Sequence, residues 1–362
     1  MDSTATSLLS VWPPAPRRAR PRPRLVPAVP RLSVVVVNYL RWQDTATLVR
    51  QLRTTPALRH GAAEVIIVDN DSPWDPLIAQ LRRMPGVSLR RWRGNRGFAR
   101  AVNEGVRLSR GDWVLLLNPD MSLEGCFLDK ALARAEELAR GDLHTGIIGF
   151  GLRDGDGSRQ RSAGPFPTLA SSLARLLLPR PLRKYYLRTT TACRPVDWVT
   201  GCCLLVRRTC WENLGGLDDA FFLYYEDVDL CRRARERGWT VWHEPSLSAT
   251  HHHPLHGRAV PAQLRLVTRH ALLSYARKHW PKWQTRILAG IIRVEAWWRQ
   301  RLAWQRGDGL RAGLFDTLSR MAGDFARGRI AAAGKHLLRV VRRREEWRAA
   351  VSDHCDSQHI SD

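Results

Sequence analysis

Four consecutive valines near the start of the chain restrict the folds open to it. They belong to the run LSVVVVNY at residues 32–39. A continuous run of β-branched residues is typical of a strand buried on both faces of a parallel sheet. The runs AEVIIVDNDS (63–72) and DWVLLLNPD (112–120) repeat this pattern, and VSLRRW (87–92) is a weaker version of it. The sequence therefore predicts a parallel sheet built from these runs.

Helical patterns separate the predicted strands. TATLVRQLRTT (45–55) places Leu48, Val49 and Leu52 on one side of a helix, and residues 97–109 form a second helical pattern. Strands that alternate with helices in this way predict a doubly wound, Rossmann-like α/β fold.

Polar residues follow three of the apolar runs where each strand is expected to end. Asn38 follows the first run, Asp69 and Asn70 the second, and Asn118 and Asp120 the third. One such cluster is also typical of a turn or a helix N-cap. Ligands of doubly wound sheets, however, bind outside the carboxyl ends of the strands. Three clusters in succession therefore predict a binding site at this edge.

Glycines and a broken apolar run mark the next segments. Gly97 lies in RGNRGFARAVNEG (93–105), ahead of a helix, where glycine lets the backbone approach a phosphate. IIGFGLRDGDGSRQRS (147–162) predicts a hairpin with an Asp-Gly turn. VDWVTGCCLLVRR (196–208) predicts a strand interrupted by Gly201.

The stretch FFLYYEDVDLCRRARERG (221–238) joins an apolar loop to an acidic helix start. The helix dipole favours acidic residues in a first turn, which accounts for one or two of the carboxylates. It does not account for the aromatic residues before them. A carboxylate beside aromatic side chains has its pKa raised toward the range useful for a general base. We therefore interpret Asp227, with its neighbour Glu226, as catalytic.

Asp120 and the run His251-His252-His253 raise the question of a metal. Adjacent histidines on a strand point to opposite faces, so a structural zinc site is not expected. A carboxylate at a strand end suits a hard divalent cation of the kind that bridges phosphates. A single histidine that reaches a metal held by Asp120 is compatible with this pattern.

The charge balance predicts an anionic partner. The chain has 58 Lys and Arg against 34 Asp and Glu, a net charge of +24. Nucleic acid, an anionic membrane surface and phosphorylated small molecules all fit such a charge. The sequence contains no motif of the common nucleic-acid-binding modules, so we expect no nucleic acid as partner.

The cysteines and the apolar stretches of the sequence indicate the cellular compartment of the protein. The seven cysteines are odd in number, and two of them, Cys202 and Cys203, are adjacent. This favours a reduced, cytoplasmic setting in which Cys126, Cys202, Cys203, Cys210 and Cys231 are small buried hydrophobic residues. No apolar stretch reaches the roughly 18 residues of a membrane span, so we expect a soluble protein or one that lies on a membrane surface.

The C-terminal part is rich in Arg and Trp. Residues 265–350 contain 20 Lys or Arg and 6 Asp or Glu. Apolar residues recur there at helical spacing, namely Ile287, Ile291, Val294, Trp298 and Leu302. Two interpretations are open: interfacial anchoring on anionic lipid, or packing onto the α/β domain.

Four segments follow from these patterns. Residues 1–31 are expected to be a disordered Pro/Arg-rich tail, and residues 32–260 the catalytic domain. Residues 261–350 are expected to form a basic, amphipathic helical extension, and residues 351–362 a second disordered tail.

Taken together, the motifs resemble those of a known family. The segments SVVVVNY, IIVDNDS, GNRGFARAVNEG, LLLNPD, VTGCCLLVRR, GGLDDAFFLYYEDVDLCRRARERGW and THHHP occur in this order between residue 32 and about residue 253. The ordered set resembles the family 2 glycosyltransferases with a GT-A fold, especially the branch that contains bacterial rhamnosyltransferases. The resemblance implies a Rossmann-like, doubly wound mixed sheet, and it covers roughly three-fifths of the chain.

The resemblance also implies roles for particular residues. Asp69 would contact the nucleoside of a nucleotide-diphosphate sugar, with Asn38 beside the base. Asp120 would hold Mg²⁺ or Mn²⁺ on the diphosphate, with help from His251. Asp227, from the Glu226-Asp227 pair, would be the general base that deprotonates the acceptor hydroxyl. The implied donor-binding set is Asn38, Asp69, Asn70, Gly97, Asn118, Gly201 and Cys202.

The implied activity is an inverting, metal-dependent transfer of a sugar, with rhamnose as a branch-level expectation. The donor is a nucleotide-diphosphate sugar, and the acceptor is a hydroxyl of a cell-surface polysaccharide or of a lipid-linked glycan. We expect the protein in the cytoplasm, with the inner face of the cell membrane as a peripheral location. The alternatives are a nucleic-acid-binding protein or a non-catalytic scaffold that uses the basic C-terminal helices.

Overall fold

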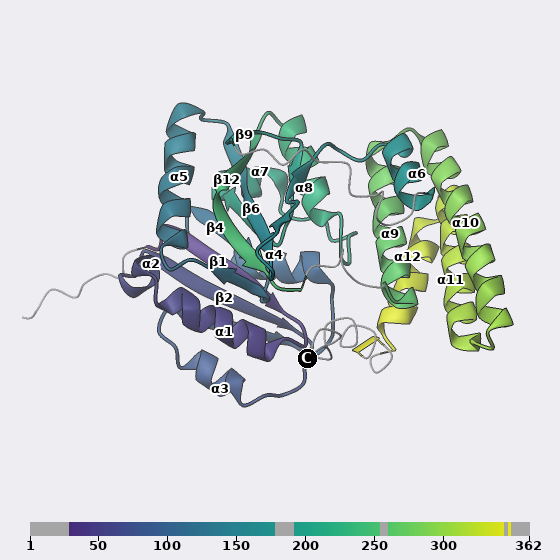
Figure 1. Ribbon diagram of the computed structural model, residues 1–362, viewed down its shortest axis with the longest axis horizontal. Coiled ribbons are helices and arrows are strands. Elements are labelled where there is room, and N and C mark those ends of the chain that lie inside the picture. The colour runs from purple at the N-terminus through teal and green to yellow at the C-terminus, as the bar shows by residue number, and fades with distance from the viewer. Residues whose placement is uncertain (1–28, 178–191, 254–259, 344–346, 349–362) are drawn as a thin grey trace, which may run out of the picture.

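The computed structural model describes residues 29–177, 192–253, 260–343 and 347–348, and its elements form two lobes (Figure 1). One lobe is a sheet with helices on both faces, and the other is a bundle of helices beside it. The strands are β1 (Leu32–Asn38), β2 (Ala63–Asn70), β3 (Val87–Trp92), β4 (Trp113–Leu117), β5 (Met121–Leu123), β6 (Thr145–Asp154), β7 (Arg159–Gln160), β8 (Ala163–Gly164), β9 (Arg194–Pro195), β10 (Trp198–Val199), β11 (Cys203–Arg207) and β12 (Thr240–His251). The helices are α1 (Trp42–Arg53), α2 (Pro56–Arg59), α3 (Leu77–Arg82), α4 (Phe98–Leu108), α5 (Phe127–Gly141), α6 (Leu169–Leu177), α7 (Arg208–Leu214), α8 (Glu226–Glu236), α9 (Ala262–His279), α10 (Lys282–Gln305), α11 (Gly309–Ala326) and α12 (Ile330–Val341).

The large sheet is mixed, as predicted. Its main path runs β3-β2-β1-β4-β11-β6-β12-β5, and β7 and β9 pair at its side. Strands β1 to β4 are parallel to one another, whereas β11 is antiparallel to both of its neighbours, β4 and β6. The parallel register pairs Asn38 with Asp69, so the polar ends of β1 and β2 lie side by side.

The valine run is buried on both faces because helices cover the sheet on either side. Val34 and Val36 pack in a core shared with α1, α2, α3 and α5, while Val35 and Val37 pack in a second core with α4, α7 and α8. Alternate side chains of a strand point to opposite faces, so a strand between two cores has no position that faces solvent. This explains why the run is continuous rather than alternating.

The helical lobe has a core of its own. Side chains from α9, α10, α11 and α12 form it, and α6 packs against it although α6 precedes these helices by many residues. Phe222 is buried in this core, and Phe221 packs with Tyr275 of α9. The aromatic loop before Glu226 is thus a contact between the two lobes. It is apolar because the helical lobe covers it, and Phe221 and Phe222 are buried in that contact.

Ion pairs tie α8 to α9 at the same junction. The buried Asp229 carboxylate lies 2.7 Å from Arg233 Nε, 2.8 Å from His279 Nε2 and 2.8 Å from Lys278 Nζ. Burial alone would raise the pKa of Asp229, but these partners bring it down to about 2. Asp229 is therefore a structural carboxylate, unlike its neighbours at the helix start.

Asp229→Asn should lower the free energy of unfolding by about 3 kcal/mol, because Arg233 and Lys278 then lose a buried counter-charge. Guanidinium denaturation would measure the change. Asp316→Asn is the matched control, since it removes an exposed pair with Arg320 on α11 and should cost no more than about 0.5 kcal/mol. Equal losses in the two variants would contradict the structural role of Asp229.

The strand runs are confirmed at 32–38, 63–70, 87–92 and 113–117, and the helices at 42–53 and 98–108. The hairpin is confirmed as β6 and β7, with Leu152 opposite Gln160. The single interrupted strand at 196–208 is wrong, because β10 pairs with β8 in a separate small sheet while β11 joins the large one. The sequence patterns did not reveal α3, α5, α6, α7 or β12.

Two smaller expectations also need correction. Cys126 is exposed, in the turn before α5, so it is not a buried hydrophobic residue; Cys202, Cys203, Cys210 and Cys231 are buried and free. The predicted tail ends too late, because the Arg31 amide donates to Ala62 O and its carbonyl accepts from Trp113 N. Residues 1–28 and 351–362 lie outside the described residues.

Candidate active site

The strand ends form a hydrogen-bonded network around Asn38. This residue is fully buried, and its Nδ2 donates to Asp69 Oδ1 at 2.9 Å and to Ser72 Oγ at 3.0 Å. Its Oδ1 accepts from the Thr45 hydroxyl at 2.8 Å. All of the side-chain polar atoms of Asn38 are thus engaged inside the protein. In this structure Asn38 holds Asp69 in place.

Asp69 is fully buried as well, and Arg91 covers it. Arg91 Nε lies 2.9 Å from Asp69 Oδ2, and its Nη2 donates to Ser72 O. Beside this pair is a hollow of about 470 Å³ with three arginines. It is lined by Asp71, Ser72, Arg82, Arg91, Trp92 and Arg93. A cationic hollow with an aromatic ring at the end of β2 suits an anionic ligand that has a flat ring.

Asn70 connects the end of β2 to the glycine loop. Its Nδ2 donates to Asn95 Oδ1 at 2.9 Å, and its Oδ1 accepts from the Arg96 amide at 2.9 Å. Gly97 follows with φ +92°, and a Cβ there would lie 2.8 Å from Phe222 O. The amides of Gly97 and Phe98 are already bonded, to Asn95 Oδ1 and Phe222 O. Glycine is needed here for contact with the aromatic loop.

Backbone strain gathers at this edge of the sheet. In the described part of the chain, four non-glycine residues have positive φ: Leu40, Asp71, Tyr224 and Tyr225. The first two follow the ends of β1 and β2, and the last two immediately precede Glu226. Such conformations cost of order 1–3 kcal/mol each and cluster at functional sites. No sequence pattern predicted these four conformations.

Asp120 and His251 form a pair at the ends of β4 and β12. Strand β5 begins directly after Asp120 and places Met121 opposite His251. His251 Nε2 lies 3.3 Å from Asp120 Oδ2, and His251 Nδ1 lies 3.2 Å from Gln160 Nε2. Burial would raise the pKa of Asp120, but the hydrogen bond and charge of His251 bring it below its usual value. The carboxylate is therefore ionised at neutral pH.

The pair has the donor atoms and spacing of a partial metal site. Bonds from Mg²⁺ to oxygen are about 2.1 Å long, so two neighbouring ligands of one cation lie about 3 Å apart. The Asp120 and His251 atoms meet this condition. Within the described residues, no cluster of three or more His, Cys, Asp and Glu side chains could hold a metal. His252 turns aside, with its Nε2 2.6 Å from Ser122 Oγ.

Cys202 lies between the two carboxylates of interest. It is buried, and burial with the nearby Asp120 and Asp227 charges raises the pKa of its thiol to about 12. Its carbonyl accepts from the Asn118 amide at 2.9 Å, which fixes the turn that leads to Asp120. The thiol is protonated at neutral pH, so Cys202 is not a nucleophile here.

Asp227 faces Gly201 from the start of α8. Its Oδ2 accepts from the Gly201 amide at 2.8 Å, and its Oδ1 from the Val228 amide at 2.8 Å. A Cβ on Gly201 would lie 3.3 Å from the Asp227 Cβ, so the glycine allows the close approach. Burial raises the pKa of Asp227 above its usual value in spite of these amides. A half-buried carboxylate of this kind can accept a proton from a substrate.

Glu226 differs from its neighbour. Its side chain is buried, and its Oε2 has no hydrogen-bond partner in the described part of the structure. Burial, together with the charges of Asp227 and Asp229, raises the pKa of Glu226 well above its usual value. Burial therefore favours the protonated form of Glu226, while the Gly201 and Val228 amides favour the negative charge on Asp227.

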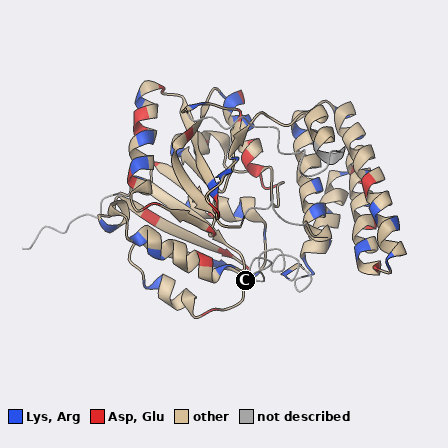
Figure 2. Ribbon diagram, in the orientation of Figure 1, with Lys and Arg blue, Asp and Glu red and all other residues tan. Residues whose placement is uncertain are grey.

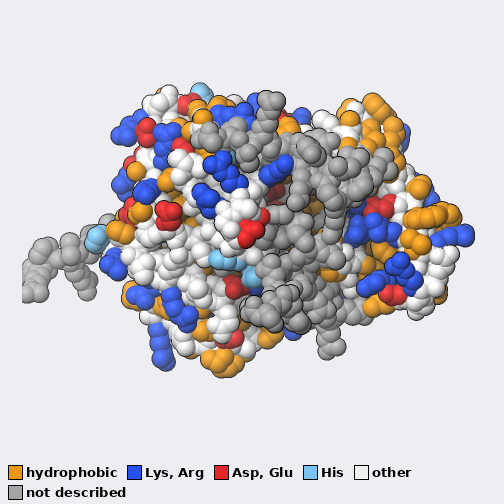
Figure 3. Space-filling model, in the orientation of Figure 1, with side chains coloured by type: hydrophobic (Ala, Val, Ile, Leu, Met, Phe, Trp, Pro, Cys, Tyr) orange, Lys and Arg blue, Asp and Glu red, His pale blue; other side chains and the backbone are white. Residues whose placement is uncertain are grey.

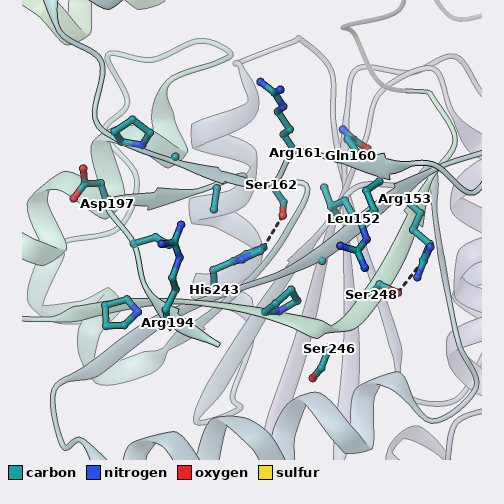
Figure 4. Close-up of a pocket in the computed structure, with 18 residues that line it drawn as sticks. Leu152, Arg153, Gln160, Arg161, Ser162, Arg194, Asp197, His243, Ser246 and Ser248 are labelled. Carbon is teal, nitrogen blue, oxygen red and sulfur yellow. Dashed lines mark hydrogen bonds between the residues drawn. The ribbon is translucent and has the colours of Figure 1, made fainter. Parts of the chain in front are cut away.

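An arginine-rich pocket of about 570 Å³ adjoins the Asp120–His251 pair through Gln160 (Figure 4). Ser162 and His243 form its floor, 2.8 Å apart. The only carboxylate among the lining residues, Asp197, is paired with Arg235. Its cationic lining side chains are Arg153, Arg159, Arg161 and Arg194. Sequence reasoning missed this pocket because its walls come from β6, β7, β8, β9 and β12.

The end of the helical lobe also reaches the strand ends. Trp347 is buried against Phe222, with ring centroids 6.1 Å apart. Arg348 Nη2 donates to Asp71 O at 3.0 Å and lies 3.7 Å from Asp71 Oδ2. The side chain of Tyr39 hydrogen-bonds Asn95 and Arg348, and burial raises its pKa. No local sequence signal indicated these contacts.

The fold and these side chains describe an α/β protein with a cationic hollow at the strand ends and a half-buried carboxylate, Asp227, at the start of α8. The comparison with known families is more specific. The profile described as "Glycosyltransferase like family 2" matches residues 30–271, which is most of the chain. The chain belongs to glycosyltransferase family 2. This supports the transferase interpretation and not the nucleic-acid-binding or scaffold alternative.

Relatives include rhamnosyltransferases, which confirms the predicted branch. The N-acetylglucosaminyl-diphospho-decaprenol L-rhamnosyltransferase of Mycobacterium tuberculosis is 30% identical over 293 residues, 75% of this chain and 88% of the relative. The low-salt glycan biosynthesis hexosyltransferase Agl10 of Haloferax volcanii is 27% identical over 62% of this chain and 68% of its own length. Rhamnosyltransferase WbbL of Escherichia coli is 26% identical over 42% of this chain and 56% of its own.

Solved structures are more distant. TarS 1–349 of S. aureus in complex with UDP has a TM-score of 0.46 and 14% identity, over 91% of this chain and 93% of that one. The mannosyltransferase PcManGT from Pyrobaculum calidifontis, with GDP-Man and Mn²⁺, has a TM-score of 0.45 and 16% identity, over 91% of this chain and 88% of that one. Among the described helices of the present chain, none is long and apolar enough to cross a membrane.

Proposed function

We propose that this glycosyltransferase is an inverting, metal-dependent enzyme that moves a sugar from a nucleotide-diphosphate donor to an acceptor hydroxyl. The position of Cys202 carries the proposal. The Asn118 amide donates to the Cys202 carbonyl two residues before Asp120, and the Gly201 amide donates to Asp227 Oδ2, so both carboxylates lie close to the dipeptide Gly201-Cys202. An inverting transfer needs these two groups on either side of the reacting carbon.

The strand ends would bind the donor. Asp69, held by Asn38, and Asn70, held by Asn95, would position the nucleoside, with Gly97 and Asn118 shaping the surrounding loops. The arginines of the cationic hollow next to Asp69 would offset phosphate charge. Asp120 and His251 would hold Mg²⁺ or Mn²⁺. When bound, such an ion supplies positive charge for the leaving diphosphate.

Asp227 would act on the acceptor. Its raised pKa suits it to take the proton of the acceptor hydroxyl, whose oxygen then forms the new bond to the anomeric carbon. The bond from that carbon to the diphosphate oxygen breaks, and the nucleoside diphosphate leaves. The Gly201 and Val228 amides orient Asp227 for this step. Gly201 and Cys202 would border the sugar and the acceptor.

The relatives suggest the two substrates. We propose a deoxyhexose such as L-rhamnose as the sugar and a diphosphate-linked glycolipid as the acceptor, since these are named for the mycobacterial relative. The arginine-rich pocket would receive the acceptor diphosphate, because it adjoins His251 and its only carboxylate is already paired. Residues 32–260 would be the catalytic domain and 261–350 the helical extension. The free cysteines fit a cytoplasmic location.

Replacing Arg159 and Arg194 of this pocket by Ala should raise the KM for a lipid-diphosphate acceptor by about tenfold or more, because each hydrogen bond to a charged group contributes about 1.5 kcal/mol. The KM for the donor should stay within about twofold. Arg140→Ala, at the exposed end of α5, is the matched control. A raised donor KM with an unchanged acceptor KM would show that the pocket binds the donor and not the acceptor.

The overall proposal is tested by a transfer assay. Purified protein with Mg²⁺ or Mn²⁺ would receive dTDP-, UDP- and GDP-sugars in turn, together with an N-acetylglucosaminyl-diphospho-polyprenol. Transfer from one donor, lost on addition of EDTA and restored by the ion, is the expected result. Full transfer in EDTA would contradict the metal-dependent part. No transfer and no binding of any donor would contradict the whole proposal.

A further inference from the structure

Helix α10 has two apolar faces, and only one of them is buried. The inner face packs in the core of the helical lobe, with Thr285, Leu288, Ala289, Ile292, Ala296 and Ala303 buried. The outer face is exposed, with Trp283, Ile287, Val294, Trp297, Trp298, Leu302 and Trp304 each at least 36% accessible. The periodic residues Ile287, Val294, Trp298 and Leu302 are therefore not core residues, although other residues of the helical lobe pack against the α/β lobe.

The exposed residues form one continuous strip, named here the α10 strip: Trp283, Ile287, Val294, Trp297, Trp298, Leu302 and Trp304. At 100° per residue their side chains point away from the buried face. At 1.5 Å per residue, Trp283 and Trp304 are about 30 Å apart along the axis. Trp297 and Trp298 lie 6.2 Å apart between ring centroids. An exposed strip of this length with four tryptophans is uncommon on a monomeric protein and indicates an interaction surface.

The charged side chains around the α10 strip indicate which kind of partner it binds. Arg286, Arg293 and Arg301 are on or beside the strip, and the Arg301 guanidinium stacks 4.7 Å from the Trp297 ring. The one acidic residue of α10, Glu295, is neutralised by Arg265, Arg269 and Arg299. Figure 2 shows Lys and Arg spread over the helical lobe, and Figure 3 shows them beside hydrophobic side chains along its outer edge. The surface is thus apolar and cationic together.

We propose that the α10 strip lies in the interface of an anionic lipid bilayer. Tryptophan rings favour the headgroup level, and arginines beside them meet anionic headgroups, so a helix of this kind lies in the plane of the interface. A second copy of the chain is a poorer occupant, because two such surfaces would bring like charges together. The proposal goes beyond the transfer reaction and does not depend on the proposed donor or acceptor. It would, however, bring the catalytic lobe to a lipid-linked substrate.

Vesicle sedimentation tests the proposal. The protein should bind vesicles of phosphatidylglycerol and phosphatidylcholine, and bind vesicles of phosphatidylcholine alone at least about tenfold more weakly. The variant W297A/W298A should lose about tenfold or more of the binding to anionic vesicles, and R286E/R293E a similar amount. Because these side chains are exposed, both variants should keep the circular dichroism spectrum and the Tm of the wild type.

Matched controls separate the strip from the rest of the surface. Trp74 is 71% exposed on the α/β lobe, and Arg140 is exposed on α5. W74A and R140E should leave vesicle binding unchanged. Binding that the strip variants do not reduce would overturn the proposal. A wild type that binds no vesicles but is dimeric, and becomes monomeric in W297A/W298A, would also overturn it and assign the strip to a second copy of the chain.

Discussion

Asp227→Asn is expected to reduce kcat for sugar transfer by roughly 10²- to 10⁴-fold, the usual contribution of a general base. The asparagine amide has nearly the same shape but cannot take the proton of the acceptor hydroxyl. Donor binding should persist, because the proposed role of Asp227 is on the acceptor hydroxyl, whereas the proposed nucleoside contacts are at Asp69 and Asn70. Steady-state kinetics and calorimetric titration of the donor would measure the two effects separately.

The pH profile adds an independent check on Asp227. A base must be deprotonated to act, so kcat/KM should fall as the pH falls through the pKa of this carboxyl group. Because burial raises that pKa, the fall should occur above pH 4, the ordinary range of an aspartate. An acidic limb at or below pH 4 would contradict the assignment.

Glu226→Gln is the matched control for Asp227→Asn. Burial favours the protonated form of Glu226, and a glutamine has the shape and the neutrality of a protonated glutamate. The variant should therefore retain activity within about tenfold of the wild type. If the variant lost as much activity as Asp227→Asn while keeping its fold, the reaction would need a negative charge on Glu226 as well as on Asp227.

Asp120→Asn should weaken transfer on the order of a hundredfold, with much of the loss appearing as poorer divalent-cation-dependent donor binding. An amide oxygen is a weaker ligand than a carboxylate, and the variant removes the negative charge that lies 3.3 Å from His251 Nε2. Titration of Mn²⁺ against the activity would show a higher half-saturating concentration. An unchanged metal requirement would contradict the role of Asp120.

The adjacent histidines provide a matched pair for the same site. His251 Nε2 lies 3.3 Å from Asp120, whereas His252 contacts Ser122. His251→Ala should therefore raise the half-saturating Mn²⁺ concentration, and His252→Ala should not. The sequence left open which histidine serves the metal. The structure favours His251 because β12 pairs it with the residue that follows Asp120.

The strand ends could be predicted from the sequence because their signals are local. Each of the runs at Asn38, Asp69 and Asp120 is apolar up to its last residue and polar after it, and parallel strands end at the same edge of a sheet. Sequence could not predict how the polar residues pair. Asn38 is fully bonded inside the protein, and Arg91 covers Asp69.

The aromatic loop shows where local reasoning fails. Its apolar residues were interpreted as part of the site, yet Phe221 and Phe222 pack against helices that follow more than 40 residues later. The same limit applies to α10, since a helical apolar period does not tell which of two faces is buried. Arg348 reaches Asp71 across 277 residues of sequence, and no spacing could indicate that.

The anomeric configuration of the product tests the account most directly. Because Asp227 acts as a base and not as a nucleophile in this proposal, transfer should invert the configuration of the donor. Proton NMR of the product, taken early in the reaction, would show the anomer opposite to that of the donor sugar. A product with the donor's own configuration would contradict Asp227 as the base of a single displacement.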